Sequence, residues 1–136
     1  MDKTLHVVVL MGGWSAEREV SLTSGRGIAD ALREHGWSNV TEVDMDRNVA
    51  QVLTGIRPDV VFNALHGTPG EDGTVQGMLE LMGIPYTHSG VETSVIAIDK
   101  ELTKMVLVPH GIRMPKGTMV DSETLYERDP LARPYV

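Results

Sequence analysis

The stretch LHVVVLMGGWSAEREVSLTSG, residues 5–25, joins an unbroken apolar run to two adjacent glycines and then to a charged, amphipathic segment. A β-branched run of this kind is typical of a strand buried on both faces, as in a parallel sheet. The glycines mark a turn, and we expect a helix over residues 16–35, with Ser15 as its N-cap and Gly36 as its end. The stretch therefore predicts a strand, a turn and a helix.

The rest of the chain repeats this alternation. We expect further strands over residues 39–45, 58–65 and 114–120, and a short strand with a turn over 84–90. Helices are expected over residues 71–83, 91–98 and 99–111. Strands that alternate with helices through short connections predict an α/β fold, a parallel Rossmann-like sheet with helices on both faces.

We divide the chain into one domain over residues 1–98 and the start of a second over residues 99–136. The polar stretch DSETLYERDPLARP precedes a last apolar YV, so we expect a new strand to begin at residues 133–136. The fragment after the first domain is too small to form a core of its own. We therefore expect the second domain to be truncated.

Composition excludes several classes of function. The net charge of −7, with acids and bases interspersed, argues against nucleic-acid binding, which needs a basic surface. Cysteine is absent, which excludes a disulfide scaffold and a thiolate nucleophile and fits a cytoplasmic protein. No apolar stretch approaches the ~20 residues that cross a bilayer, so we expect no membrane segment. No pair of histidines has zinc-ligand spacing, and we expect no metal site within the chain.

The glycine turn does not match either common phosphate-binding motif. Gly12 and Gly13 are adjacent, so the turn lacks the G-x-G-x-x-G pattern of a dinucleotide site, and no G-K-S/T follows them. Two acids follow instead. At about 100° per residue, Ser21 lies within roughly 40° of Glu17, whereas Glu19 lies about 160° away. We therefore expect Glu17 at the mouth of the helix on its inward face and Glu19 in solvent.

Residue type alone leaves two interpretations of Glu17 open. It is either a first-turn acid that the helix dipole stabilises, or a fixed anion that binds a cationic group such as a substrate ammonium. His66, in the glycine-rich loop ALHGTPGEDG (residues 64–73), is likewise either a structural hydrogen bonder or a group that orients a ligand. In the same loop, Glu71 and Asp72 are expected to cap the helix that follows.

Three motifs in this order resemble the amino-terminal part of D-alanine–D-alanine ligases: GGWSAEREVSLTSG, ALHGTPGEDGTVQGMLELMGIPYTHSGV and AIDKELTKMVL. The similarity runs through nearly all of residues 4–120. The family belongs to the ATP-grasp class and makes the D-Ala-D-Ala dipeptide for bacterial peptidoglycan. The resemblance implies that ATP phosphorylates the carboxylate of one D-alanine, and that the amine of a second attacks the acyl phosphate. Mg²⁺ is the implied metal cofactor.

The resemblance also implies roles for particular residues. Glu17 matches the glutamate that anchors the ammonium of the first D-alanine, and Val20 matches the position against the substrate methyl. His66 matches the histidine of the L-H-G motif beside that substrate. Lys100 matches the lysine that reaches the ATP phosphates. By the same resemblance, residues 1–98 are the pre-ATP-grasp domain, and residues 99–136 are the connecting helix and the start of the central ATP-grasp domain.

Further expectations follow from the resemblance. The protein is expected to be a cytoplasmic homodimer. Most residues that bind ATP and Mg²⁺ are expected after residue 136. The chain by itself is therefore expected to lack ligase activity. Trp14 departs from the smaller or more polar residue usual at its position; it either packs on a neighbouring loop or narrows the crevice. Two alternatives stay open: a relative that uses D-lactate as second substrate, and a non-catalytic ligand-binding or dimerisation module.

Overall fold

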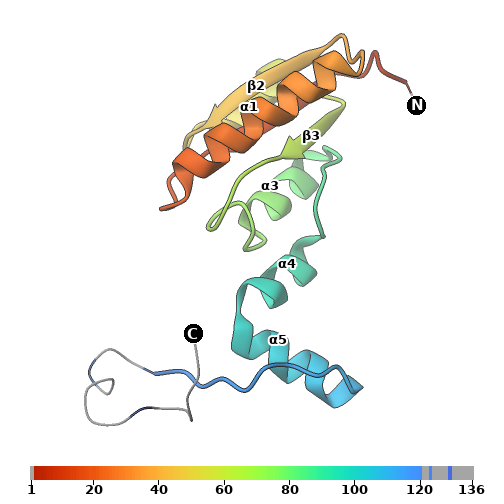
Figure 1. Cartoon of the computed structure of the whole chain (residues 1–136). Helices are drawn as coiled ribbons and strands as arrows, with labels where there is room; N and C mark the ends of the chain where they lie inside the picture. Colours follow the sequence, from red (N-terminus) through yellow and green to blue (C-terminus); the bar gives the residue numbers. More distant parts are fainter. Residues whose placement is uncertain (1, 121–122, 124–128, 130–136) are drawn as a thin grey trace. The chain divides into compact units, whose positions relative to one another are not determined.

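The computed structural model describes residues 2–120, 123 and 129, and the chain divides into two compact units, Met1–Val95 and Ile96–Val136 (Figure 1). The sheet lies in the first unit, together with Glu17, Val20 and His66. Lys100 lies in the second unit. The strand expected at residues 133–136 falls outside the described residues.

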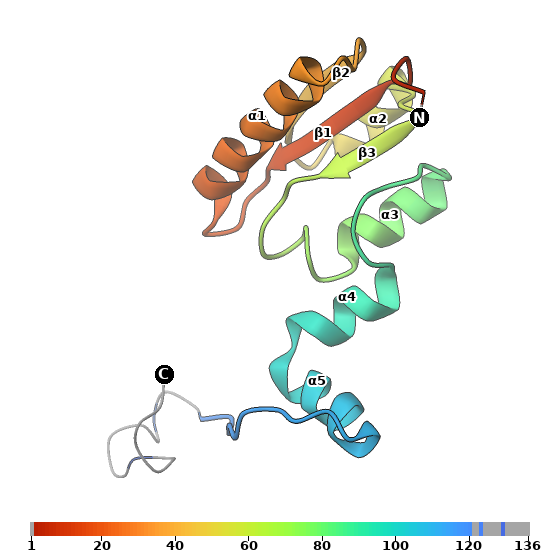
Figure 2. The same ribbon diagram turned by 45° about the vertical axis from the view of Figure 1, so that its right-hand side comes forward.

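A three-stranded parallel sheet forms the centre of the first unit, in the order β2-β1-β3 (Figure 2). Its strands are β1 (Val7–Gly12), β2 (Val40–Met45) and β3 (Val60–Asn63). Val7 of β1 lies opposite Val40 of β2 and Val60 of β3. All six residues of β1 are buried, which confirms the prediction of a strand covered on both faces.

Helices cover both faces of this sheet, which confirms the predicted α/β class (Figure 2). The helices of the first unit that pack on it are α1 (Arg18–Glu34), α2 (Val49–Ile56) and α3 (Thr74–Met82). Val9 and Met11 of β1 belong to the apolar cluster with α1, whereas Val8 and Leu10 belong to the cluster with α2 and α3. Alternate residues of one strand thus supply two cores, because successive side chains of a strand point to opposite faces.

α1 approaches β1 closely at Gly25. A Cβ atom on this glycine would lie 2.5 Å from the Cβ of Met11, so a larger residue does not fit. The buried line of α1 runs through Ser21, Gly25 and Ala29. The buried face of α1 is therefore centred on a different side of the helix from the expected face, which was centred on Glu17. Glu17 itself is exposed, at the edge of the buried line.

The start of α1 differs from the prediction, whereas its end agrees with it. The helix begins at Arg18, and no side chain caps it, so Ser15 is not its N-cap. The Ser15 hydroxyl makes other hydrogen bonds, which include one to the loop after β3. Gly36 follows the last turn with a φ of 86°, the left-handed conformation that glycine adopts readily.

Three other segments differ from the sequence-based expectation. The sequence pattern does not predict α2. The strand expected over residues 84–90 is a single parallel bridge between Val61 and Tyr86. Residues 114–120 form no strand, because a strand needs a paired neighbour and its composition alone does not supply one.

The helices expected over residues 91–98 and 99–111 are present as α4 (Val91–Ile98), α5 (Lys100–Leu107) and a 3-10 turn, η1 (Val108–His110). Asp99 caps α5, as predicted: its carboxylate accepts hydrogen bonds from the backbone N–H groups of Glu101 at 2.9 Å and Leu102 at 3.0 Å. Among the described residues, no helix is both long and apolar enough to cross a bilayer.

Two glycines of α1 provide a matched test of its packing on β1. Gly25→Ala should destabilise the chain by about 1–3 kcal/mol, because the added methyl overlaps Met11. Gly27→Ala should stabilise it by roughly 0.5–1 kcal/mol, because no atom lies within 4 Å of the added Cβ and alanine favours a helix. Urea unfolding followed by circular dichroism measures both. Stabilisation by both substitutions would contradict the close contact.

Candidate substrate-binding site

A buried serine joins the carboxyl ends of β1 and β3. The backbone N–H of Gly12 donates a hydrogen bond to the Ser21 hydroxyl oxygen at 2.9 Å, and that hydroxyl donates to the carbonyl of Ala64 at 2.7 Å. Ser21 is fully buried, so water does not compete for either bond. The loop that leads to Glu17 and the loop that leads to His66 therefore start from one fixed point at the strand ends, where parallel α/β folds bind ligands.

Ser15 joins the same two loops further out. Its hydroxyl donates to the carbonyl oxygen of His66 at 2.8 Å and accepts from the backbone N–H of Glu17 at 3.1 Å. Gly67 lies directly against both residues: a Cβ atom there would be 3.3 Å from the Ser15 Cβ and 2.9 Å from Oε2 of Glu17. The structure thus brings Glu17 and His66 together through Ser15 and Gly67.

The His66 ring lies between α1 and its own loop. Its Nε2 is 3.5 Å from the hydroxyl of Ser24, and its Nδ1 is 3.9 Å from Oε1 of Glu71. The other carboxylate oxygen of Glu71 accepts from the backbone N–H of Gly67 at 2.8 Å. Glu71 thus supports the His66 loop and does not cap α3 as expected, whereas Asp72 accepts from the N–H of Thr74, the first residue of α3, at 3.0 Å.

Sequence reasoning did not assign Ser24 and Glu71 to this site. Ser24 follows Glu17 by two helical turns, and a small residue at that spacing is typical of helix packing. Glu71 follows Gly67 by four residues in a loop with three glycines, a spacing that suits a side chain bonding back to its own loop. A carboxylate at this position could equally cap the helix that follows. Only the folded structure therefore distinguishes the two roles of Glu71.

Val20 places an apolar side chain next to these polar groups. It lies one helical turn after Glu17 on α1, and it is 56% exposed. Among the described residues, the Glu17 carboxylate accepts no hydrogen bond, and Glu17 is also exposed. A free carboxylate, an exposed valine and a histidine together suit a small ligand with an ammonium, a short apolar side chain and a polar group.

Arg18 holds the turn on its other side. The guanidinium forms two hydrogen bonds with the carboxylate of Asp44 at the end of β2, at 2.7 and 2.6 Å, and a third with the carbonyl of Gly13 at 3.0 Å. Hydrogen bonding to Arg18 holds the pKa of the Asp44 carboxyl below its ordinary value, so the pair remains charged at neutral pH. Arg18 is thereby engaged with Asp44 and does not neutralise Glu17.

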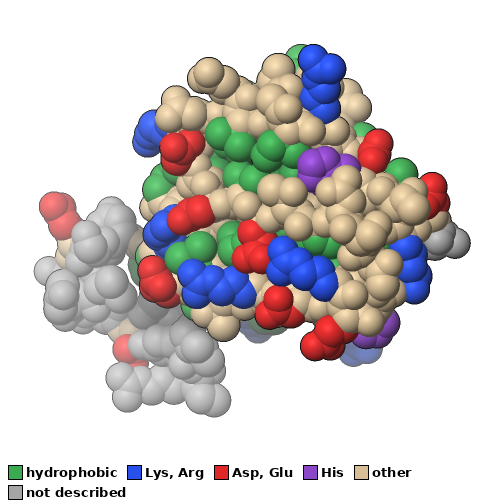
Figure 3. Space-filling model, turned by 90° about the horizontal axis from the view of Figure 1, so that it is seen from above, with side chains coloured by type: hydrophobic (Ala, Val, Ile, Leu, Met, Phe, Trp, Pro, Cys, Tyr) green, Lys and Arg blue, Asp and Glu red, His purple; other side chains and the backbone are tan. Residues whose placement is uncertain are grey.

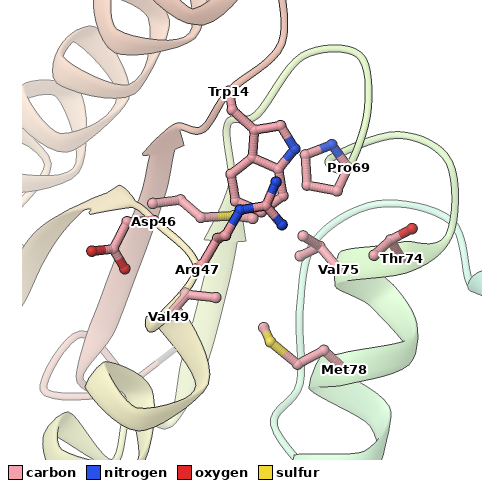
Figure 4. Close-up of a pocket in the computed structure, with 9 residues that line it drawn as sticks. Trp14, Asp46, Arg47, Val49, Pro69, Thr74, Val75 and Met78 are labelled. Carbon is pink, nitrogen blue, oxygen red and sulfur yellow. The ribbon is translucent and has the colours of Figure 1, made fainter.

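Trp14 packs away from this site. The Arg47 guanidinium lies over its ring, 4.6 Å from the ring centre, and the two side chains line an open pocket of about 270 Å³ with Pro69 and the start of α3 (Figure 4). Met45 and Val49, from β2 and α2, line the same pocket. Glu17, Val20 and His66 do not line it. This placement favours the packing role of Trp14 over a narrowing of the Glu17 site.

Lys100 is exposed at the first residue of α5, in the second unit. No group of three His, Asp or Glu side chains within the described part of the chain has the geometry to hold a metal ion. Acidic and basic side chains intermingle on the face shown in Figure 3, which carries no continuous basic surface.

A parallel α/β sheet with polar and charged side chains gathered at the carboxyl ends of its strands is the arrangement typical of ligand-binding α/β domains. Comparison with known proteins shows what this domain is similar to. A family model described as the D-ala D-ala ligase N-terminus matches residues 50–89. The D-alanine–D-alanine ligase of Rhizorhabdus wittichii is 70% identical over 136 residues, which are 100% of this chain and 43% of that protein. That of Sphingopyxis alaskensis is 74% identical over 131 residues, 96% of this chain and 42% of that protein.

Solved structures agree with this result. The D-alanine–D-alanine ligase of Bacillus anthracis, solved in complex with ATP, superposes with a TM-score of 0.74 at 34% identity over 83% of this chain and 38% of its own. The ligase of Aeromonas hydrophila gives a TM-score of 0.76 at 31% identity over 88% of this chain and 52% of its own. The resemblance of this chain to the amino-terminal part of the D-alanine–D-alanine ligases is confirmed. The chain spans less than half the length of the Rhizorhabdus wittichii and Sphingopyxis alaskensis ligases.

Proposed function

We propose that this chain forms the first-substrate side of an ATP-dependent D-alanine–D-alanine ligase that acts in peptidoglycan synthesis. One observation carries the proposal: Glu17 presents an exposed carboxylate without a hydrogen-bond donor among the described residues, directly beside the His66 loop. The high identity to proteins named as D-alanine–D-alanine ligases supports the same reading. No observation favours a D-lactate-using relative or a non-catalytic module.

Each residue of the site has a role in holding the first D-alanine. The Glu17 carboxylate binds the ammonium group, and a charge-assisted hydrogen bond of this kind contributes about 1.5–3 kcal/mol. Val20 lies against the methyl group, and His66 orients the polar end of the substrate. Together they fix the substrate so that its carboxylate faces the phosphate donor, which lowers the entropic part of the reaction barrier.

The remaining chemistry involves ATP and Mg²⁺. We assign residues 1–98 to the pre-ATP-grasp domain and residues 99–136 to the connecting helix and the start of the central ATP-grasp domain. Lys100 is the residue that we propose to contact the ATP phosphates. Because the described residues form no metal site, we assign no Mg²⁺ ligand within them. The use of ATP and the absence of cysteine support a cytoplasmic location.

The role of Glu17 can be tested in a chimeric ligase, in which this chain replaces the corresponding part of the Sphingopyxis alaskensis ligase. Glu17→Gln keeps the size of the side chain but removes the charge that binds the ammonium. We expect kcat/KM for D-alanine to fall roughly ten- to a hundredfold. Glu19→Gln, an exposed acid in the first turn of the same helix, should have almost no effect. Equal effects of the two substitutions in steady-state kinetics would show that Glu17 is only a first-turn acid that the helix dipole stabilises.

The role of Lys100 predicts a different kinetic signature. Lys100→Ala in the chimeric ligase should raise the KM for ATP more than the KM for D-alanine, because it removes a cation from the phosphates. Lys104→Ala is the control, since the Lys104 ammonium is paired with Glu101 at 2.6 Å on the same helix. An unchanged ATP dependence of the Lys100 variant would show that this lysine is only a solvated helix charge.

We also propose that the ligase is a homodimer that uses α3 as a contact surface. Leu81 is 92% exposed on this helix, whereas Val75 and Leu79 are buried in the core. Met78 and Met82 on the same helix are half-buried. Together with Leu81 they form apolar surface that is not covered by packing on the sheet. Exposed apolar surface of this kind often marks a partner contact.

A charge on α3 should disrupt this dimer. Leu81→Asp in the chimeric ligase should shift the sedimentation equilibrium from dimer towards monomer, because burial of an unpaired carboxylate is unfavourable. Thr54→Asp adds the same charge at an exposed position of α2 and should leave the equilibrium unchanged. A dimer of equal strength in the Leu81 variant, or a monomer before any substitution, would remove α3 as the interface.

A further inference from the structure

We propose that Ser15 is a positioning residue for the first-substrate site, whose hydroxyl sets the distance between the Glu17 turn and the His66 loop. The inference rests on the proposed function, because it concerns the same site. Ser15 does not cap α1, which is the role that the sequence predicts for its hydroxyl.

The geometry of the hydroxyl carries the proposal. A single oxygen accepts from the backbone N–H of Glu17 at 3.1 Å and donates to the backbone carbonyl of His66 at 2.8 Å. The two bonds join segments that are 51 residues apart at the positions that carry the two site residues. Because both bonds go to backbone atoms, they place the segments while leaving both functional side chains available to a ligand.

The His66 side chain depends on this backbone contact. The partners of its ring are distant: Ser24 is at 3.5 Å from Nε2, at the limit of a hydrogen bond, and Glu71 is at 3.9 Å from Nδ1. Neither contact fixes the ring strongly. The bond from Ser15 to the His66 carbonyl, at 2.8 Å, is the shorter and better constraint, so the position of the ring follows the position of its backbone.

Gly67 shows that the two segments are held close together. It adopts a φ of 63°, and a Cβ atom there would lie 3.3 Å from the Ser15 Cβ and 2.9 Å from Oε2 of Glu17. Only a residue without a side chain allows the His66 loop to approach the Glu17 carboxylate this closely. Ser21 does not substitute for Ser15, because it bonds at the strand ends, before either loop diverges.

The chimeric ligase tests the proposal through three serine and threonine variants. Ser15→Ala should raise the KM for D-alanine about three- to tenfold, as expected for one lost hydrogen bond, with the KM for ATP and the thermal midpoint nearly unchanged. Ser15→Thr retains the hydroxyl and should restore the KM for D-alanine. Thr23→Ala removes a hydroxyl that bonds only within α1, to the Glu19 carbonyl at 2.9 Å, and should alter none of these values.

The outcomes separate this inference from the proposed function. An unchanged KM for D-alanine in Ser15→Ala, or a parallel rise of both KM values with a lower thermal midpoint, would overturn the positioning role even where Glu17→Gln is impaired. Failure of Ser15→Thr to restore the KM would overturn it as well. An inactive chimeric ligase, or a Glu17→Gln variant with unchanged kinetics, would overturn the proposed function and this inference with it.

Discussion

The buried hydroxyl of Ser21 is the interaction on which the site depends. It accepts from the N–H of Gly12 and donates to the carbonyl of Ala64, so one side chain of α1 joins the ends of two parallel strands. The Ser21 hydroxyl thus satisfies two backbone groups in a buried place, where an unpaired polar group is costly. Because Gly25 lets α1 lie close to β1, this serine is deep enough to reach both strands. The helix, the strand ends and the two loops thus form one connected structure.

Charge pairing leaves Glu17 available to a ligand, because the neighbouring Arg18 is paired elsewhere. Arg18 is engaged with Asp44 and the carbonyl of Gly13 on the β2 side. The Glu17 carboxylate lies against Gly67 instead. An exposed carboxylate retains its hydration, so leaving it unpaired costs little in the folded protein. The turn contains two adjacent glycines but neither common phosphate-binding motif, and its exposed acid suits a cationic group.

Hydrogen bonds between side chains and the backbone hold the His66 loop, although three of its residues are glycines. The amides of Asn63 and Gln76 both donate to the carbonyl of Gly70, at 2.8 and 2.7 Å, and both side chains are buried. The carboxylate of Glu71 accepts from the N–H of Gly67. Glycines give the loop its close approach to Glu17, and these polar contacts offset the conformational freedom that the glycines would otherwise leave.

The sequence by itself determined the parallel α/β class, the buried strand β1, the Asp99 cap of α5 and the family resemblance. Each of these is a local property: a run of β-branched residues, a capping side chain, or a motif of adjacent residues. It did not determine the start of α1, the presence of α2 or the lack of a strand at residues 114–120, because these depend on what the rest of the chain offers as a partner. The tertiary structure alone decided that Ser15 joins Glu17 to His66 and that Glu71 supports the loop. A hydroxyl or a carboxylate can bond to many backbone groups, and the fold selects one by bringing segments 51 residues apart within hydrogen-bond distance.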